Sequence, residues 1–382
     1  MLFFLVVFLS SGCISNNKRV FDSNSNNEDV LLMIKVDEIV AQMSLEERIS
    51  QLFIITTNQS EYSGKLSQEI NRYQPGGFII FTHNIESADQ ITKMIDDMQK
   101  DSKLAMFIAT DQEGGRVQRF SNVKGIELTV IPSMQEVGKR NDSDYAWNLG
   151  RTIGKELSIF GVNMNFAPCL DIGSNNRNTV VGDRSFGSNP EIVTNMALQI
   201  AKGMREEGII PVYKHFPGHG GTIEDSHFKL AILNKDKEDL LTKELIPYIE
   251  VIKQDADVIM IGHISVPKLT MDNTPATLSP LITTKLLKEE LGFEGVVISD
   301  ALNMKGLRDN YNDEEILIQA LNAGIDILLI PQDLKEAIDI IKKGIENNQI
   351  NENRIDESVK KILLLKFKYR ILKLADFQNK EE

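Results

Sequence analysis

Three of the five histidines in the sequence fall within 13 residues, on a segment that contains several glycines. The segment begins KHFPGHGG at Lys214 and ends with Asp225-Ser226-His227. A single histidine is more often structural than functional, but a cluster on a glycine-rich loop indicates a functional site, because loops carry many binding and catalytic residues. His215 and His219 are four residues apart, as zinc ligands on a helix are, but the glycines break such a helix. Zinc is therefore the weaker interpretation.

Asp225 and His227 are two residues apart in the chain. A carboxylate that close to an imidazole can fix its tautomer and favour its protonated form, which makes the histidine a usable proton donor and acceptor near neutral pH. The pair is therefore a candidate general acid and base. The alternative is an ion pair on a surface loop.

Asp300 ends an apolar run, residues 296–299 (VVIS), and is followed by Ala-Leu-Asn-Met. A carboxylate at the end of a buried strand needs partners or a function that offsets its desolvation. Asp300 is therefore a candidate nucleophile or general base. The alternative is a helix N-cap for the turn that follows.

Two further loops carry groups suited to binding a polyhydroxyl ligand, which has no charge but many hydrogen-bond donors and acceptors. Residues 111–120 read DQEGGRVQRF and include Asp111 and Arg119. Residues 182–187 read GDRSFG and present Arg184. Taken alone, either loop could equally be a salt-bridged turn.

Regular elements must hold these loops, and the chain alternates short apolar runs with longer amphipathic stretches. We expect strands at residues 51–56, 76–81, 104–111, 162–168, 209–216, 257–263, 295–300 and 325–330. We expect helices at residues 88–100, 144–160, 190–207, 238–253, 280–291, 313–323 and 334–347. Several strands are nearly continuous in Ile, Val, Phe and Met, which is typical of parallel strands buried on both faces. The alternation predicts an α/β fold, a (β/α)8 TIM-type barrel rather than an open doubly wound sheet.

Four polar residues fall at the C-terminal ends of these predicted strands, namely Asp111, His215, His263 and Asp300. In a barrel those ends converge on one face, which is where active sites lie. A single domain, residues 31–382, accounts for the rest of the chain, because no change of composition suggests a linker.

The composition narrows the function classes. The chain has 42 Lys and Arg against 55 Asp and Glu, a formal net charge of −13, with 42% hydrophobic residues. It can therefore bury a large core, and its acidic balance argues against nucleic-acid binding, which uses basic patches. Two cysteines, Cys13 and Cys169, cannot form a disulfide framework. Nothing indicates a metal or an organic cofactor, and we expect a monomer because no exposed apolar stripe stands out.

Residues 1–9 are all apolar and are followed by Ser10-Ser11-Gly12-Cys13. This run is too short to span a bilayer but fits an export signal. Small residues before a cysteine resemble the lipobox of bacterial lipoproteins, although no Lys or Arg precedes the run. We expect residues 1–13 to be an export signal that ends in a lipidated Cys13, and residues 14–30 to be a flexible polar tether. The protein would then be anchored at the cell surface or in the periplasm; the alternative is a cleaved signal and a secreted protein.

Together these segments resemble glycoside hydrolase family 3, and within it the bacterial β-N-acetylglucosaminidases. The specific motifs are KHFPGHG (214–220), the DSH triplet (225–227) and SDALNM (299–304). Lesser stretches agree over residues 36–374, namely MSLEERISQLF, PGGFIIF, FAPCLDI and RIDESVKKILLLK. The family's catalytic domain is a (β/α)8 barrel, the fold that the strand pattern also predicts.

The resemblance implies a role for each matching residue. Asp300 would be the nucleophile that forms a covalent glycosyl-enzyme, His227 the general acid and base, and Asp225 its orienting partner. The residues implied to bind the sugar are Asp111, Arg119, Arg184, Lys214 and His215. Those implied to line the same region are His219, His263 and Met304.

The implied mechanism is the retaining one, with a His–Asp pair in place of the usual acid/base carboxyl group. The implied activity is that of an exo-β-N-acetylglucosaminidase, a β-N-acetylhexosaminidase, which acts on GlcNAc-containing saccharides or muropeptides derived from peptidoglycan. Other family members take the acid/base from a C-terminal αβα sandwich domain, which we expect this chain to lack. Gly221 stands where many relatives have Asp, a position with no assigned role in proton transfer.

Several alternatives remain open at this point. The same dyad would also suit a phosphorylase, because a neutral histidine repels phosphate less than a carboxylate does. A β-glucosidase and a metal-dependent barrel hydrolase are weaker enzymatic alternatives. From another class, the chain could be a non-catalytic sugar-binding lipoprotein, although a pure binder has no need of Asp300, Asp225 and His227 together.

Overall fold

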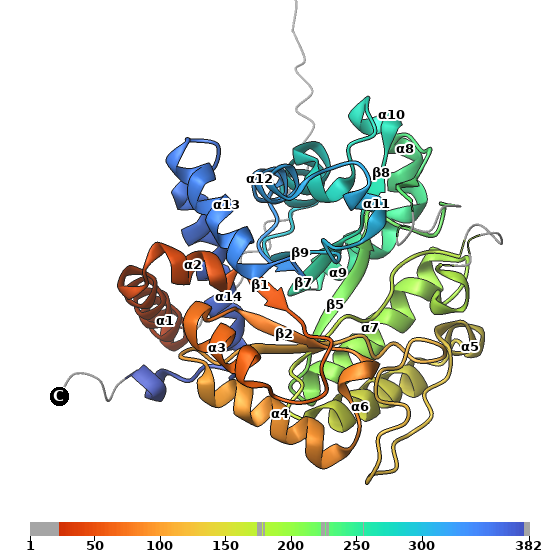
Figure 1. Ribbon diagram of the computed structural model, residues 1–382. Coiled ribbons are helices and arrows are strands. Elements are labelled where there is room, and N and C mark those ends of the chain that lie inside the picture. Colours follow the sequence, from red (N-terminus) through yellow and green to blue (C-terminus); the bar gives the residue numbers. More distant parts are fainter. Residues whose placement is uncertain are drawn as a thin grey trace, which may run out of the picture.

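Eight parallel strands form the centre of the computed structural model, which describes residues 23–173, 178, 180–222, 226, 229–254 and 256–377 (Figure 1). The strands are β1 (Phe53–Ile55), β2 (Gly77–Ile80), β3 (Phe107–Thr110), β4 (Met164–Asn165), β5 (Ile210–Phe216), β7 (Val258–Ile261), β9 (Val296–Ser299) and β10 (Leu328–Leu329). Each lies inside one of the predicted strand ranges. Their order is β10-β1-β2-β3-β4-β5-β7-β9.

The two ends of this sheet meet and close a barrel. A parallel bridge joins Ile298 of β9 to Ile327, next to β10, and the Ser299 amide donates to the Ile327 carbonyl at 2.9 Å. The predicted (β/α)8 TIM-type barrel is therefore confirmed. Every residue of β5 is buried, as expected for parallel strands covered on both faces.

Helices surround the barrel, as Figure 1 shows. They are α2 (Leu45–Gln51), α3 (Gly64–Tyr73), α4 (Ala88–Asp101), α6 (Ser143–Ile159), α7 (Pro190–Glu206), α9 (Ile246–Lys253), α12 (Asp313–Ala323), α13 (Leu334–Glu346) and α14 (Glu352–Lys368). Capping boxes fix several of the helix starts, for example Ser87 with Gln90 at α4 and Asn312 with Glu315 at α12. Each box satisfies backbone amides that have no partner within the helix.

Two predicted helices are not continuous α-helices. Residues 238–253 divide into the end of α8 (Lys237–Asp239), the π-helix η3 (Leu240–Glu244) and α9. Pro247 lacks the amide proton that an unbroken α-helix needs, which explains an irregular turn just before it. Residues 280–291 are a π-helix, η5 (Leu281–Glu290).

The N-terminal part of the described chain corrects one boundary. Helix α1 (Ser23–Gln42) begins inside the range expected to be a tether, so residues 23–30 are helical. Its later turns bury Val36, Ile39 and Val40 in the core beside α14, which stabilises a helix that its polar start does not predict.

An exposed apolar group on α1 departs from a second expectation. Val30, Leu31, Met33 and Ile34 are all exposed. The expectation of a monomer rested on the absence of such a group, so that argument does not hold. No helix of the described residues is long and apolar enough to cross a membrane. Residues 1–13, with Cys13, lie outside the described part of the chain.

Candidate active site

A cavity of about 410 Å³ lies at the C-terminal ends of the barrel strands. Each of the eight strands, or the residue just after it, contributes to the lining through Thr56, Ile79, Asp111, Phe166, Lys214, Met260, Asp300 and Leu329. Buried parallel strands that end in polar residues at one face therefore build the cavity, as the sequence predicts. Arg119, Arg184, His215 and Met304, which the sequence also predicts, line the same cavity.

Asp300 lies directly after β9 and lines the cavity. Its backbone amide donates to the Ile261 carbonyl at the end of β7, at 2.9 Å, which holds the residue against the barrel. The Ala301 amide donates to its Oδ1 atom at 2.8 Å. The following helix α11 (Lys305–Arg308) is capped by Met304 rather than by Asp300, so the helix-cap alternative is wrong.

Four buried or partly buried charges form a chain of contacts along one wall of the cavity. Lys214 Nζ lies 2.8 Å from Asp111 Oδ1 and 2.6 Å from Glu113 Oε1. Arg184 donates to both oxygens of Glu113, each at 2.8 Å. Glu113 thus joins the two cations, although the sequence singled out only its neighbours.

Arg119 extends this chain of contacts. Its Nη2 atom donates to Asp111 Oδ2 at 3.3 Å, and its guanidinium lies over the Phe81 ring, 5.5 Å from the centroid. The Nε atom is buried and has no partner among the described residues. The side chain as a whole is partly exposed and lines the cavity, so Arg119 is placed to donate to a ligand oxygen.

The two carboxylates of this wall stay ionised. Burial by itself would raise the pKa of Glu113, but the charges of Arg184 and Lys214 outweigh it and hold that pKa well below its usual range. At Asp111 the charges of Lys214 and Arg119 likewise outweigh the effect of burial, so the pKa of Asp111 is lowered. Asp111 and Glu113 can therefore accept hydrogen bonds from a ligand but cannot donate a proton to one near neutral pH.

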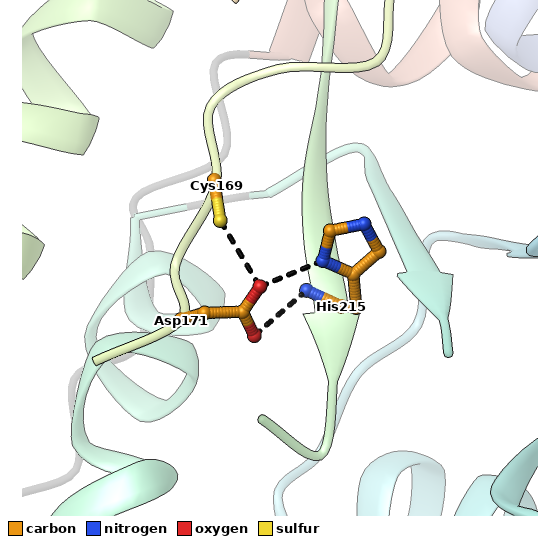
Figure 2. Close-up of side chains that lie close together, drawn as sticks. All are labelled: Cys169, Asp171 and His215. Carbon is orange, nitrogen blue, oxygen red and sulfur yellow. Dashed lines mark hydrogen bonds and ion pairs between the residues drawn. The ribbon is translucent and has the colours of Figure 1, made fainter. Parts of the chain in front are cut away.

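The His215 ring is bound by Asp171, a residue that the sequence-based predictions did not include. Figure 2 shows Asp171 between Cys169 and His215. His215 Nδ1 lies 2.7 Å from Asp171 Oδ2. The other ring nitrogen, Nε2, lies 3.4 Å from Arg184 Nη2, and both residues line the cavity. The ring is therefore fixed by Asp171 at one nitrogen and contacts Arg184 at the other.

Two predicted histidines do not line the cavity, which corrects the expectation for both. His219 is buried in its own loop, where Thr222 Oγ1 lies 2.7 Å from Nδ1 and Ser226 Oγ lies 3.0 Å from Nε2. His263 lies 2.9 Å from the Ala301 carbonyl through Nε2. Each ring contacts other protein groups through both of its nitrogens, so both histidines stabilise loops.

The remaining predicted pair, Asp225 and His227, lies outside the described residues. Ser226 between them is described, and it is buried. Its carbonyl oxygen lies so close to Gly306 that an added Cβ there would approach it to 2.3 Å. Ser226 is therefore packed against the segment that follows Asp300.

Comparisons with known proteins agree with this site. Residues 44–365 match the model of the glycosyl hydrolase family 3 N terminal domain. The chain is 36% identical to a β-hexosaminidase A of Pseudoalteromonas piscicida over 331 residues, which are 80% of this chain and 55% of that protein. It is 34% identical to a β-hexosaminidase of Haemophilus influenzae, over 73% of this chain and 77% of that one.

A solved structure indicates the same family. A family 3 β-N-acetylglucosaminidase from Paenibacillus sp. str. FPU-7 superimposes with a TM-score of 0.83 at 35% identity, covering 86% of this chain and 63% of that chain. The chain spans 55% of the length of the Pseudoalteromonas relative. The family that the motifs predicted is confirmed: the chain belongs to glycosyl hydrolase family 3, and its barrel is that family's N-terminal domain.

Proposed function

We propose that the protein is a retaining exo-β-N-acetylglucosaminidase that removes terminal β-linked GlcNAc from peptidoglycan-derived saccharides such as muropeptides. One observation carries the proposal most directly. Asp300 lines a cavity in which the connected side chains Asp111, Lys214, Glu113 and Arg184 present ionised and hydrogen-bonding groups suited to sugar hydroxyls. Relatives named β-hexosaminidase and β-N-acetylglucosaminidase support the choice of sugar.

In the proposed first step, a carboxylate oxygen of Asp300 attacks the anomeric carbon. The bond to the leaving-group oxygen breaks with its electron pair, and His227 donates a proton to that oxygen. In the second step His227 removes a proton from water, the water oxygen attacks the anomeric carbon, and Asp300 leaves as a carboxylate. Two displacements at one carbon retain the β configuration.

The state of the cavity carboxylates supports a histidine as the acid. A retaining enzyme needs a group that is protonated near neutral pH beside the leaving group. Asp111 and Glu113 cannot serve, because nearby cations lower the pKa of each. We assign this role to His227 with Asp225, as the DSH motif implies, and the packing of Ser226 against Gly306, in the segment that follows Asp300, supports the assignment.

The charge of the cavity favours hydrolysis over phosphorolysis. Among the described residues, the lysine, arginine and carboxylate side chains that line it are three cations and three carboxylates, namely Arg119, Arg184, Lys214, Asp111, Glu113 and Asp300. Lys214 and Arg184 are each paired with a carboxylate at 2.8 Å or less. An incoming phosphate dianion would therefore meet no excess of positive charge, whereas water and an uncharged sugar need none.

The function is tested by release of nitrophenol from β-N-acetylglucosaminide and β-glucoside substrates in phosphate-free buffer. The proposal predicts strong preference for the acetamido sugar and no stimulation by added phosphate. Preference for the glucoside would favour a β-glucosidase. A requirement for phosphate would favour a phosphorylase, and no reaction with either substrate would favour a sugar-binding protein.

We also propose that the protein is exported and anchored through a lipid on Cys13. The apolar run of residues 1–9, followed by Ser-Ser-Gly-Cys, supports this proposal. Labelled palmitate supplied to bacteria that express the chain should enter the wild type and not Cys13→Ala. Equal labelling of both, or of neither, would contradict the anchor.

A further inference from the structure

Asp171 is a buried carboxylate outside the cavity lining that accepts hydrogen bonds from four donors. Its Oδ2 atom lies 2.7 Å from His215 Nδ1 and 3.0 Å from Cys169 Sγ. Its Oδ1 atom accepts the His219 amide at 2.6 Å and the His215 amide at 3.3 Å. Both carboxylate oxygens are therefore used twice, and Asp171 has no exposed surface at all.

These contacts fix where the protons are. Burial by itself would raise the pKa of Asp171, but its contacts with His215 and the other donors hold it well below the usual range, so the group is a carboxylate and only accepts. Burial raises the pKa of the Cys169 thiol, which stays protonated and donates. His215 Nδ1 must then carry a proton too, and in the neutral ring the Nε2 lone pair faces Arg184 Nη2 at 3.4 Å.

We propose that Asp171, with Cys169, is a positioning residue that locks the tautomer of His215, so that Nε2 accepts a hydrogen bond from a sugar hydroxyl. The Arg184 guanidinium beside Nε2 can only donate, so the two groups together offer a ligand hydroxyl one acceptor and one donor. The inference rests on the proposed function in one respect, that the cavity binds a sugar.

A metal ion is the other interpretation of this cluster, since Cys169, Asp171 and His215 are all metal-ligating types whose ligand atoms lie within 4.8 Å of one another. The distances favour protons. Ligands of a tetrahedral zinc ion lie roughly 3.3 Å or more apart, given zinc–ligand bonds of about 2.0–2.3 Å. The 2.7 Å between His215 Nδ1 and Asp171 Oδ2 is a hydrogen-bond distance instead.

Asp171→Asn should reverse the tautomer. The amide has one accepting oxygen and one donating NH2 group. The two backbone amides that face Oδ1 cannot change, so the oxygen must stay there and the NH2 group must face His215 Nδ1. Nδ1 then has to accept, the ring proton moves to Nε2, and Nε2–H meets the donors of Arg184.

The first test is nitrogen NMR of protein labelled only at its five histidines, assigned with His215→Gln. In the wild type we expect the His215 proton on Nδ1, and in Asp171→Asn on Nε2. A wild-type ring with its proton on Nε2 alone would overturn the proposal, as would a shift of the His215 signals on adding Zn²⁺ to chelator-treated protein. This readout needs no activity, so it remains informative if the proposed function fails.

The second test is kinetic and uses a matched control. Asp326 is also fully buried and accepts from Arg354, Ser358 and the Val297 amide, but it lies before β10, away from the cavity. Asp171→Asn should lower kcat/KM by on the order of 10- to 100-fold, the usual cost of removing an orienting partner. Asp326→Asn should lower stability without this loss.

A double-mutant cycle separates positioning from general disruption. In a His215→Gln background, Asp171→Asn should cost little further activity, because its effect passes through the ring that is already gone. Full additivity of the two losses would overturn the proposal. Cys169→Ser keeps a hydrogen-bond donor and should retain more activity than Cys169→Ala. Equal losses in the two variants would show that Cys169 does not help to position His215.

Discussion

Glu113 binds two cations at once, since its Oε1 atom lies 2.6 Å from Lys214 Nζ and 2.8 Å from Arg184 Nη2. All three side chains are almost completely buried, so their charges compensate one another at a poorly solvated wall of the cavity. A buried charge without a partner is costly, and this explains why the three residues occur together.

Glu113→Gln should therefore destabilise the protein by about 3–5 kcal/mol, because it leaves the buried Arg184 guanidinium without its carboxylate partner and Lys214 with Asp111 alone. It should also lower kcat/KM, since Lys214 and Arg184 line the cavity. The measurement is urea unfolding with parallel kinetics. Asp183→Asn is the control, because Asp183 pairs with Arg116 in a largely exposed contact and should cost under about 1 kcal/mol. Equal costs for the two variants would contradict the account.

Acid should destabilise the fold through the same carboxylates. The pKa of Glu113 in the folded protein lies below its ordinary value of 4.5, so the unfolded chain binds more protons than the folded one as the pH falls below that value. The stability that Glu113 contributes is complete above pH 4.5 and is lost as the pH falls towards the folded-state pKa. Unfolding free energies measured between pH 3 and 7 (roughly) should show a flatter acid limb in Glu113→Gln. An unchanged limb would refute this assignment.

Lys366 is a buried amine that has no carboxylate partner among the described residues. Its Nζ atom contacts Gln51 Oε1 at 3.0 Å and lies over the Phe107 ring. Burial lowers its pKa from 10.5 to about 7, so the unfolded chain binds more protons between these values and stability rises with pH there. Lys366→Met should remove that slope and stabilise the protein at neutral pH, by on the order of 1–3 kcal/mol. Lys335 is exposed, so the control variant Lys335→Met should change neither the pH slope of stability nor the stability at neutral pH.

His227→Ala should affect substrates according to their leaving groups. A natural disaccharide needs protonation of its leaving oxygen, whereas a nitrophenyl glycoside needs little. We expect a much larger loss of kcat/KM with the disaccharide than with the nitrophenyl substrate. Equal losses on both would rule out His227 as the acid.

The barrel could be predicted from the sequence because a buried parallel strand appears there as a short apolar run that ends in a polar residue. That rule found Asp111 and Asp300. It applies equally to Asp171, which follows the apolar stretch at β4, and to Glu113, two residues after Asp111; neither was singled out, because charges in a loop do not reveal their partners.

His219, His263 and the start of α1 differ from the sequence-based expectations for one physical reason. Position in the chain indicates that His219 and His263 lie near strand ends, but it does not show which way a side chain points, and both rings support loops. Similarly, the polar start of α1 contains no helical pattern, and its helix is stabilised by contacts of Val36 and Ile39 with the core. Tertiary packing decided each of these cases.

The most direct test of the central claim is mass spectrometry of the enzyme during turnover of a fluorinated N-acetylglucosaminyl substrate that slows the second displacement. The account predicts one added sugar on the peptide that contains Asp300, and none in Asp300→Ala. A sugar on a different residue, or turnover that inverts the anomeric centre without any adduct, would contradict the assignment of Asp300 as the nucleophile.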